Sequence, residues 1–266
     1  MLETLLKRDR RIVVLAIAAM TAFAWLYLLW LSRSMTMGGS PMPDMPGMDM
    51  SAAMAPMLRS WTSADFAFIF VMWAIMMIGM MTPSAAPMIL IYARVARQSA
   101  LEGRPLAATG LFAGGYLLSW TAFSLAAAVA QGALERAAWL TPMMAAANNM
   151  VGGIVLIATG LYQGTPLKDA CLKQCQSPFA FIQSHGGFGK GVTGALRLGL
   201  HHGFYCIGCC WALMALLFAG GVMNIAWIAA IAIFVLIEKV LPTGRLVARF
   251  AGVGLVLAGT WLIIRS

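Results

Sequence analysis

The chain has 266 residues, of which 61% are hydrophobic and only 10% are charged. Soluble domains carry about 25% charged residues, so this composition excludes an ordinary soluble domain and favours an integral membrane protein. The net charge of +9 does not indicate nucleic-acid binding, because the basic residues lie in short segments between apolar runs, where they act as topology determinants.

Several apolar runs are long enough to cross a membrane, since a spanning helix needs about 20 mostly apolar residues. The runs are continuous instead of alternating, which predicts helices and excludes a barrel. We therefore expect an all-α fold, a polytopic bundle of about seven transmembrane helices. The expected spans cover residues 12–31, 64–92, 106–130, 145–163, 202–220, 223–238 and 246–264.

The positions of the basic residues predict the orientation of this bundle. If seven spans start from a cytoplasmic N-terminus, only Arg33, Arg59, Arg136 and Arg265 of the 18 lysines and arginines lie outside. An excess of lysine and arginine is the usual mark of cytoplasmic segments. We therefore expect a multi-pass protein of the bacterial inner membrane with its N-terminus in the cytoplasm.

This topology divides the chain into three parts. Residues 1–34 are expected to form a retained anchor helix, because their apolar run is longer than the roughly 7–15 residues of a signal peptide. Residues 35–60 are expected to form a methionine-rich external loop. Residues 61–266 are expected to form a six-span membrane domain with a cytoplasmic loop that contains cysteines.

The expected external loop holds eight methionines within 23 residues, namely Met35, Met37, Met42, Met45, Met48, Met50, Met54 and Met57. The intervening glycine, proline, serine and aspartate residues exclude a hydrophobic core. A thioether is a soft, neutral ligand that suits copper(I) and, unlike a thiol, forms no disulfide outside the cell. We expect a capture loop for copper(I) or silver(I) that uses Met42, Met45, Met48 and Met50. The alternatives are a disordered linker or a sacrificial target for oxidants.

A second group of methionines lies in the second expected span. Met72, Met76 and Met80 are spaced by four residues, and Met77 and Met81 lie beside them on one broad side of the helix. We expect Met76, Met80 and Met81 to act as ligands along a path for the metal. The alternative is ordinary packing, because methionine often fills gaps in apolar cores.

Pro83 and Pro87 interrupt the same span. A proline removes a backbone donor and kinks a helix, and a broken helix can offer free carbonyl groups to an ion. We expect a broken helix here. The alternative is a packing kink in which Thr82 and Ser84 satisfy the freed backbone groups.

All five cysteines fall on the cytoplasmic half of the expected topology. Cys171 and Cys175 lie four residues apart in an inside loop, and the other three follow His201 in the first two turns of the fifth span. The side chains of His202, Cys206, Cys209 and Cys210 fall within an arc of about 100° on one helix face. If the Cys171–Cys175 segment folds back under the membrane, four or five thiols and an imidazole converge.

Cysteine and histidine together indicate a metal site. A reducing cytoplasm argues against structural disulfides, and thiolates with an imidazole suit copper(I), zinc or an iron–sulfur cluster. The spacing of the cysteines matches no standard zinc or ferredoxin pattern. Copper(I) is the favoured metal because of the methionines, and zinc and an iron–sulfur cluster stay open.

Glu238 and Lys239 close the sixth expected span. A carboxylate near membrane depth normally needs a partner, so we expect Glu238 to pair with a basic residue or with a proton linked to the metal. Lys239 is expected to extend its amine to the membrane surface. The alternative is an interfacial ion pair.

Several motifs resemble a bacterial domain-of-unknown-function family whose members are described as predicted metal-binding integral membrane proteins. The resemblance covers roughly residues 60–260, and it does not include the methionine-rich loop. It rests on the segments 80–88 (MMTPSAAPM), 160–168 (GLYQGTPLK), 171–178 (CLKQCQSP), 202–211 (HGFYCIGCCW) and 221–224 (GVMN), and on the later Glu238 and Lys239.

The sequence therefore favours a protein of the lipid bilayer that binds copper(I) for transport or trafficking, with a copper chaperone or another membrane protein as a partner and without nucleic acid. No arrangement of residues typical of a catalytic site is present in the sequence. Two alternatives stay open. One is a membrane thiol redox protein in which the cysteines of the fifth span react with Cys171 and Cys175, and the other is a non-catalytic assembly subunit with a structural metal.

Overall fold

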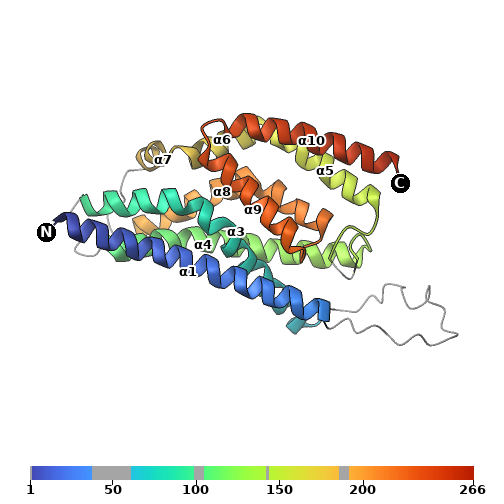
Figure 1. Cartoon of the computed structure of the whole chain (residues 1–266), viewed down its shortest axis with the longest axis horizontal. Coiled ribbons are helices and arrows are strands. Elements are labelled where there is room, and N and C mark those ends of the chain that lie inside the picture. Colours follow the sequence, from blue (N-terminus) through green and yellow to red (C-terminus); the bar gives the residue numbers. More distant parts are fainter. Residues whose placement is uncertain (1, 38–60, 99–104, 142–143, 186–191) are drawn as a thin grey trace.

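A computed structural model describes residues 2–37, 61–98, 105–141, 144–185 and 192–266. Within these ranges the protein is an all-α bundle of nine helices, as expected (Figure 1). The helices are α1 (Leu2–Met37), α3 (Ser63–Gln98), α4 (Pro105–Arg136), α5 (Asn149–Gln163), α6 (Pro166–Gln176), α7 (Pro178–Ser184), α8 (Val192–Gly220), α9 (Ile225–Val240) and α10 (Gly244–Ile264).

Five of the described helices are long and apolar enough to cross a membrane, which makes the chain a multi-pass membrane protein by helix composition. These spans are Arg10–Ser34, Ser63–Val95, Ala108–Arg136, Thr193–Gly220 and Gly244–Ile264. A sixth exists if α5 and α6, which are bent by 65° relative to each other, count as one broken span.

The sequence predicted seven spans, whereas the described residues contain five, or six with the bent pair. The expected span 223–238 corresponds to α9, which has only 16 residues. A helix of that length extends about 24 Å, which is shorter than the hydrocarbon core of about 30 Å. The orientation of the bundle stays a prediction.

The helices pack in pairs, with α5 along α10, α4 along α8, and α3 between α1 and α4. Figure 1 shows α8 and α9 in the middle of the bundle, between the α5–α10 pair and the long helices α1, α3 and α4. The close approach of α4 and α8 depends on small residues. A Cβ atom on Gly199 would lie 2.0 Å from the carbonyl oxygen of Phe112, and one on Gly115 would lie 2.3 Å from that of Leu196. Glycine therefore lets the two backbones touch.

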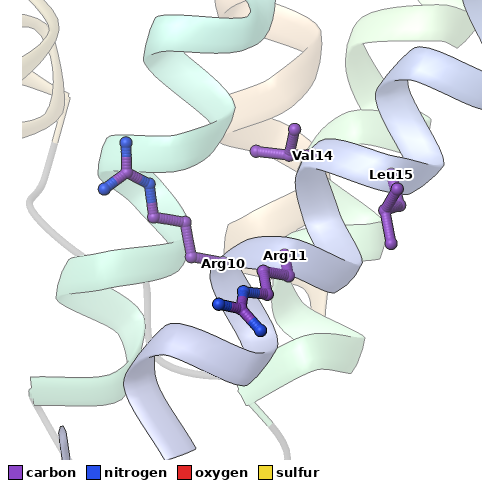
Figure 2. A pocket seen from close by; sticks show the side chains of 4 residues that line it. All are labelled: Arg10, Arg11, Val14 and Leu15. Atoms are coloured by element: carbon purple, nitrogen blue, oxygen red, sulfur yellow. The ribbon is translucent and has the colours of Figure 1, made fainter. Parts of the chain in front are cut away.

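One end of the α1 span carries two positive charges. Arg10, Arg11, Val14 and Leu15 line a pocket of about 480 Å³ on this helix (Figure 2). The arginines stand where the apolar stretch begins, which is the usual position of basic residues beside lipid headgroups.

The prediction of a broken second span is wrong, because α3 runs without interruption through Pro83 and Pro87. Proline at position 83 has no N–H group for the carbonyl of Gly79, four residues earlier. The indole Nε1 of Trp25 on α1 donates a hydrogen bond to this carbonyl oxygen at 3.3 Å. A neighbouring helix thus replaces the lost donor.

The hydroxyl groups of Thr82 and Ser84 do not make the bonds that the alternative interpretation expects, because the carbonyls that lose a donor to Pro83 and Pro87 are those of Gly79 and Pro83. The hydroxyl of Ser84 donates to the carbonyl oxygen of Met81 at 2.9 Å, and the phenol of Tyr116 donates to the same oxygen at 3.1 Å. The Thr82 hydroxyl is buried without a hydrogen-bond partner among the residues that the structure describes. The carbonyl of Met81 is therefore occupied by two donors and is not free to bind an ion.

Helix α8 begins ten residues before the expected start of the fifth span. Its first turns contain Arg197, which points to the exposed side while Ala195 and Leu198 are buried, so the apolar face continues past the charged residue. Cys206 therefore lies near the centre of the span Thr193–Gly220. The cysteines of α8 do not lie in its first two turns.

Candidate metal centre

Five methionines of α3 form a buried column. Their side chains are 0–1% exposed and belong to the main hydrophobic core. The methionine column consists of Met72, Met76, Met77, Met80 and Met81. At a rise of 1.5 Å per residue these residues extend over about 13 Å of the helix. Each of the later methionines follows an earlier one by four or five residues, about one helical turn, so all five sulfur atoms lie on the side of α3 that faces the bundle.

Helix α6 packs against α8, and this contact brings together cysteines that are far apart in the sequence. The Sγ atoms of Cys175 and Cys209 lie 3.9 Å apart. Cys206 lies within side-chain interaction distance of Cys175, Cys209 and Cys210. These four residues are called the thiol cluster below, and none of them is in a disulfide. The expectation that the Cys175 segment folds back onto the cysteines of α8 is confirmed.

The local sequence explains why α6 turns back. Helix α5 ends at Gln163, and Thr165 begins the next helix by accepting a hydrogen bond from the backbone N–H of Lys168. Pro166 occupies the first turn, where its missing N–H and fixed φ favour a helix start. The two helices meet at 65°, so α6 leaves the direction of α5 and crosses to α8.

A buried ion pair holds α6 against α9. The Nζ atom of Lys168 lies 2.8 Å from Oε1 and 2.9 Å from Oε2 of Glu238, and both side chains are almost fully buried. The side-chain oxygen of Gln163 accepts another hydrogen bond from Lys168, and Gln176 donates to the backbone oxygen of Glu238 at 2.7 Å. The expected basic partner of Glu238 is therefore Lys168. From the sequence, Lys168 is expected only to be one of the basic residues that determine the topology.

The methionine column and the thiol cluster meet at one contact. The Sγ atom of Cys210 lies 4.0 Å from the Sδ atom of Met81. Both side chains are 0–1% exposed, so the two sulfur atoms face each other inside the bundle. Soft ligands thus follow one another from α3 into the thiol cluster without an intervening polar layer.

The prediction that Lys239 extends to the membrane surface is wrong. Its side chain is only 8% exposed, and Nζ lies 2.8 Å from Sγ of Cys206 and 3.0 Å from Oγ of Ser84. A buried ammonium group needs compensating partners, and the sulfur and hydroxyl of these two residues provide them. Tyr116 adds a further contact, since its phenol oxygen lies 3.2 Å from the same sulfur. The sequence did not indicate Tyr116 as part of the site.

His202 and Cys171 lie beside the thiol cluster and not inside it. The ring of His202 is buried among Phe112, Tyr116 and Phe181, with ring centroids 5.3–6.0 Å apart. Cys171 faces α8 one residue before Cys209, where a Cβ atom on Gly208 would lie 2.7 Å from its sulfur. The expected methionine ligands Met42, Met45, Met48 and Met50 lie outside the described residues.

The sulfur donors are arranged in pairs. Two sulfur atoms that share one soft ion at bonds of about 2.3 Å are separated by about 3.8–4.0 Å for tetrahedral to trigonal angles. The Cys175–Cys209 and Cys210–Met81 distances of 3.9 and 4.0 Å fit this range. Over the described part of the chain, no group of three or more His, Cys, Asp and Glu side chains is arranged to hold one ion. The thiol and thioether sulfurs are soft ligands of the kind that suits copper(I).

A comparison with known proteins identifies the family of this chain. A family model with the description "PpoB2: Copper chaperone" matches residues 70–262, which include the methionine column, the thiol cluster and the Lys168–Glu238 pair. No curated protein and no solved structure matches the chain. The description of this family names copper as the metal and a chaperone as the role. The chain belongs to the PpoB2 copper chaperone family.

Proposed function

We propose that this protein is a membrane copper(I) chaperone that passes the ion between the methionine column and the thiol cluster. The observation that carries this proposal is the 4.0 Å contact between Met81 and Cys210, which joins the two sets of sulfur ligands. Both sets are buried, so an ion that moves between them stays away from water and oxidants.

The types of ligand support movement of the ion in preference to permanent storage. Thioethers bind copper(I) without losing a proton, whereas thiols must be deprotonated and then bind more tightly. The affinity therefore rises from Met81 towards the thiol cluster. Pairs of sulfurs leave coordination positions open, and an ion held by two ligands can be taken over by a third.

The ammonium group of Lys239 supports the same function through its charge. A copper(I) ion bound by two thiolates carries a net negative charge, which is costly in the interior of a membrane protein. Lys239 lies next to Cys206 and would compensate that charge without acting as a ligand. The phenol oxygen of Tyr116 also lies 3.2 Å from the Cys206 sulfur.

The first experiment is the copper content of protein purified without oxygen. We expect bound copper in the wild type and a loss of at least half of it in Cys175→Ser/Cys209→Ser. The matched control is Cys171→Ser, which changes the thiol of α6 that lies outside the cluster and should retain the copper. Equal copper in all three proteins would contradict a role for the thiol cluster.

A thiol redox function is the second candidate, because the free thiols of Cys175 and Cys209 lie 3.9 Å apart. Formation of an S–S bond of about 2.05 Å would need only a small movement of the two side chains. Trapping of free thiols in cells grown under reducing and oxidising conditions separates the two functions. In cells supplied with copper, a chaperone whose thiols hold the ion forms no disulfide in either condition, whereas a redox protein loses two thiols to a disulfide under oxidising conditions.

A further inference from the structure

The three histidines of the chain lie close together, in the N-terminal third of α8 and after the short helix α7. The ring of Phe181, on the short helix α7, lies 4.4 Å from that of His185 and 5.3 Å from that of His202. The ring of His201 lies 5.5 Å from that of His185. Residues of α8 and the end of α7 thus lie close together here, and none of the three histidines belongs to the thiol cluster.

The Nδ1 atom of His185 lies 2.9 Å from the carbonyl oxygen of Phe181 and 3.0 Å from the hydroxyl oxygen of Ser184. In the tautomer that donates from Nδ1 to this carbonyl, the lone pair is on Nε2 and faces away from the Phe181 carbonyl. Histidine ligands of metal ions are typically fixed in this way, with one ring nitrogen bound to a backbone carbonyl and the other to the metal.

The separation of His185 and His201 also fits a shared ion. With metal–nitrogen bonds of about 2.0–2.1 Å, each ring centre lies about 3.2 Å from the metal, and two such rings are about 5.2–5.5 Å apart for tetrahedral to trigonal angles. The observed distance of 5.5 Å falls in this range. Both side chains are half-buried, so an ion between them would be accessible from outside the bundle.

We propose that His185 and His201 form a second copper site, separate from the thiol cluster, in which one nitrogen of each imidazole binds the ion and a further coordination position is open to solvent. Imidazole is a common ligand of copper. The site exchanges copper with the surroundings of the bundle, whereas the thiol cluster holds it inside. This exchange role rests on the proposed function, but binding at the two imidazoles does not depend on the thiols.

The test is X-ray absorption at the copper edge, together with copper stoichiometry, on full-length protein loaded with excess copper(I) in detergent without oxygen. The wild type should show sulfur ligands and the outer-shell scattering of imidazole. His185→Gln/His201→Gln should lose one copper per chain and the imidazole scattering, and keep the sulfur signal. Gln183→Ala, an exposed change on the same short helix, should leave both signals intact.

A second variant separates this site from the proposed function. Cys175→Ser/Cys209→Ser should lose sulfur scattering and keep the imidazole signal. If only the histidine variant loses copper, the imidazole site stands and the thiol function fails. Unchanged copper and imidazole scattering in His185→Gln/His201→Gln would overturn the site. Should that double variant fail to elute as a folded protein, His201→Gln alone, which changes a half-buried residue, must still reduce the imidazole signal.

Discussion

The Sδ atom of Met81 lies 4.0 Å from the Sγ atom of Cys210, and this contact joins α3 to α8. Met81 is the last member of the methionine column, and its backbone oxygen accepts hydrogen bonds from Ser84 and Tyr116. The position of this thioether is thus fixed from its own helix and from α4. We therefore expect copper transfer across this contact to depend on the sulfur atom of Met81 more than on the volume of its side chain.

Met81→Leu is expected to reduce copper transfer into the thiol cluster at least tenfold. Leucine keeps the volume of methionine, and such exchanges usually cost less than about 1.5 kcal/mol of stability, but it has no sulfur. The measurement is the rate at which copper(I) added to the purified protein becomes bound by thiolate, followed by ultraviolet absorbance. Met88→Leu, at an equally buried methionine of α3 outside the column, is the control. Equal rates in the two variants would show that the sulfur of Met81 is not used.

Removal of one partner of the Lys168–Glu238 pair should be costly, because the other charge is left buried without compensation. We expect Lys168→Met to lower the free energy of unfolding by about 3–5 kcal/mol, and Lys168→Met/Glu238→Leu to restore much of it. The measurement is denaturant unfolding in micelles.

The control for this pair is the exposed ion pair between Arg249 and Asp169, with an N–O distance of 3.1 Å. Arg249→Ala should cost less than about 1 kcal/mol, as is usual for exposed pairs. The idea of an electrostatic link between α6 and α9 fails if Lys168→Met and Arg249→Ala have the same effect.

Trp25→Phe should destabilise the protein by about 1–3 kcal/mol, because the carbonyl of Gly79 then lacks its donor. In a Pro83→Ala background the residue at position 83 has an N–H group again and can bond to the same carbonyl. The same tryptophan substitution should therefore cost less there. Thermal unfolding of the four proteins measures this difference, and Trp30→Phe, at an exposed position of α1, controls for the loss of an indole. Equal costs in both backgrounds would mean that the indole does not replace the donor lost at Pro83.

Mild oxidation of copper-free protein should form a disulfide between Cys175 and Cys209, whose sulfur atoms are 3.9 Å apart. Copper(I) loaded beforehand should slow this reaction at least several-fold, because the same sulfur atoms are then metal ligands. Peptide mapping by mass spectrometry identifies the bond. Cys171, which faces Gly208, should stay free and is the internal reference. Oxidation that proceeds at the same rate with and without copper contradicts metal binding by this pair.

The sequence predicted those features that depend on helical period. The helical bundle follows from the apolar runs, and the shared face of Cys206, Cys209 and Cys210 follows from about 100° per residue. The methionine column is also visible in the spacing of Met72, Met76 and Met80. Each of these features lies on one helix, where position in the sequence determines position in space.

The errors concern contacts between helices. Pro83 does not break α3, because the replacement donor is Trp25 of another helix. Lys239 is not at the surface, because Ser84 and Cys206, from α3 and α8, surround its amine. Nothing in the local sequence indicates such neighbours, so only the arrangement of the bundle could reveal them. The span 223–238 is an error of another kind, because its 16 residues are already fewer than the about 20 that a crossing needs, and α9 has the same length.

Glu238 and Lys239 are adjacent on α9, yet they contact different helices: Glu238 pairs with α6, and Lys239 lies beside Cys206 on α8. Neighbouring residues of a helix point about 100° apart, so the rotation of α9 about its own axis decides whether both contacts form together. One residue inserted in α9 before Glu238 would turn both side chains away from their partners at once. The dipeptide thus ties the rotation of α9 to α6, which carries Cys175, and to α8, which carries Cys209.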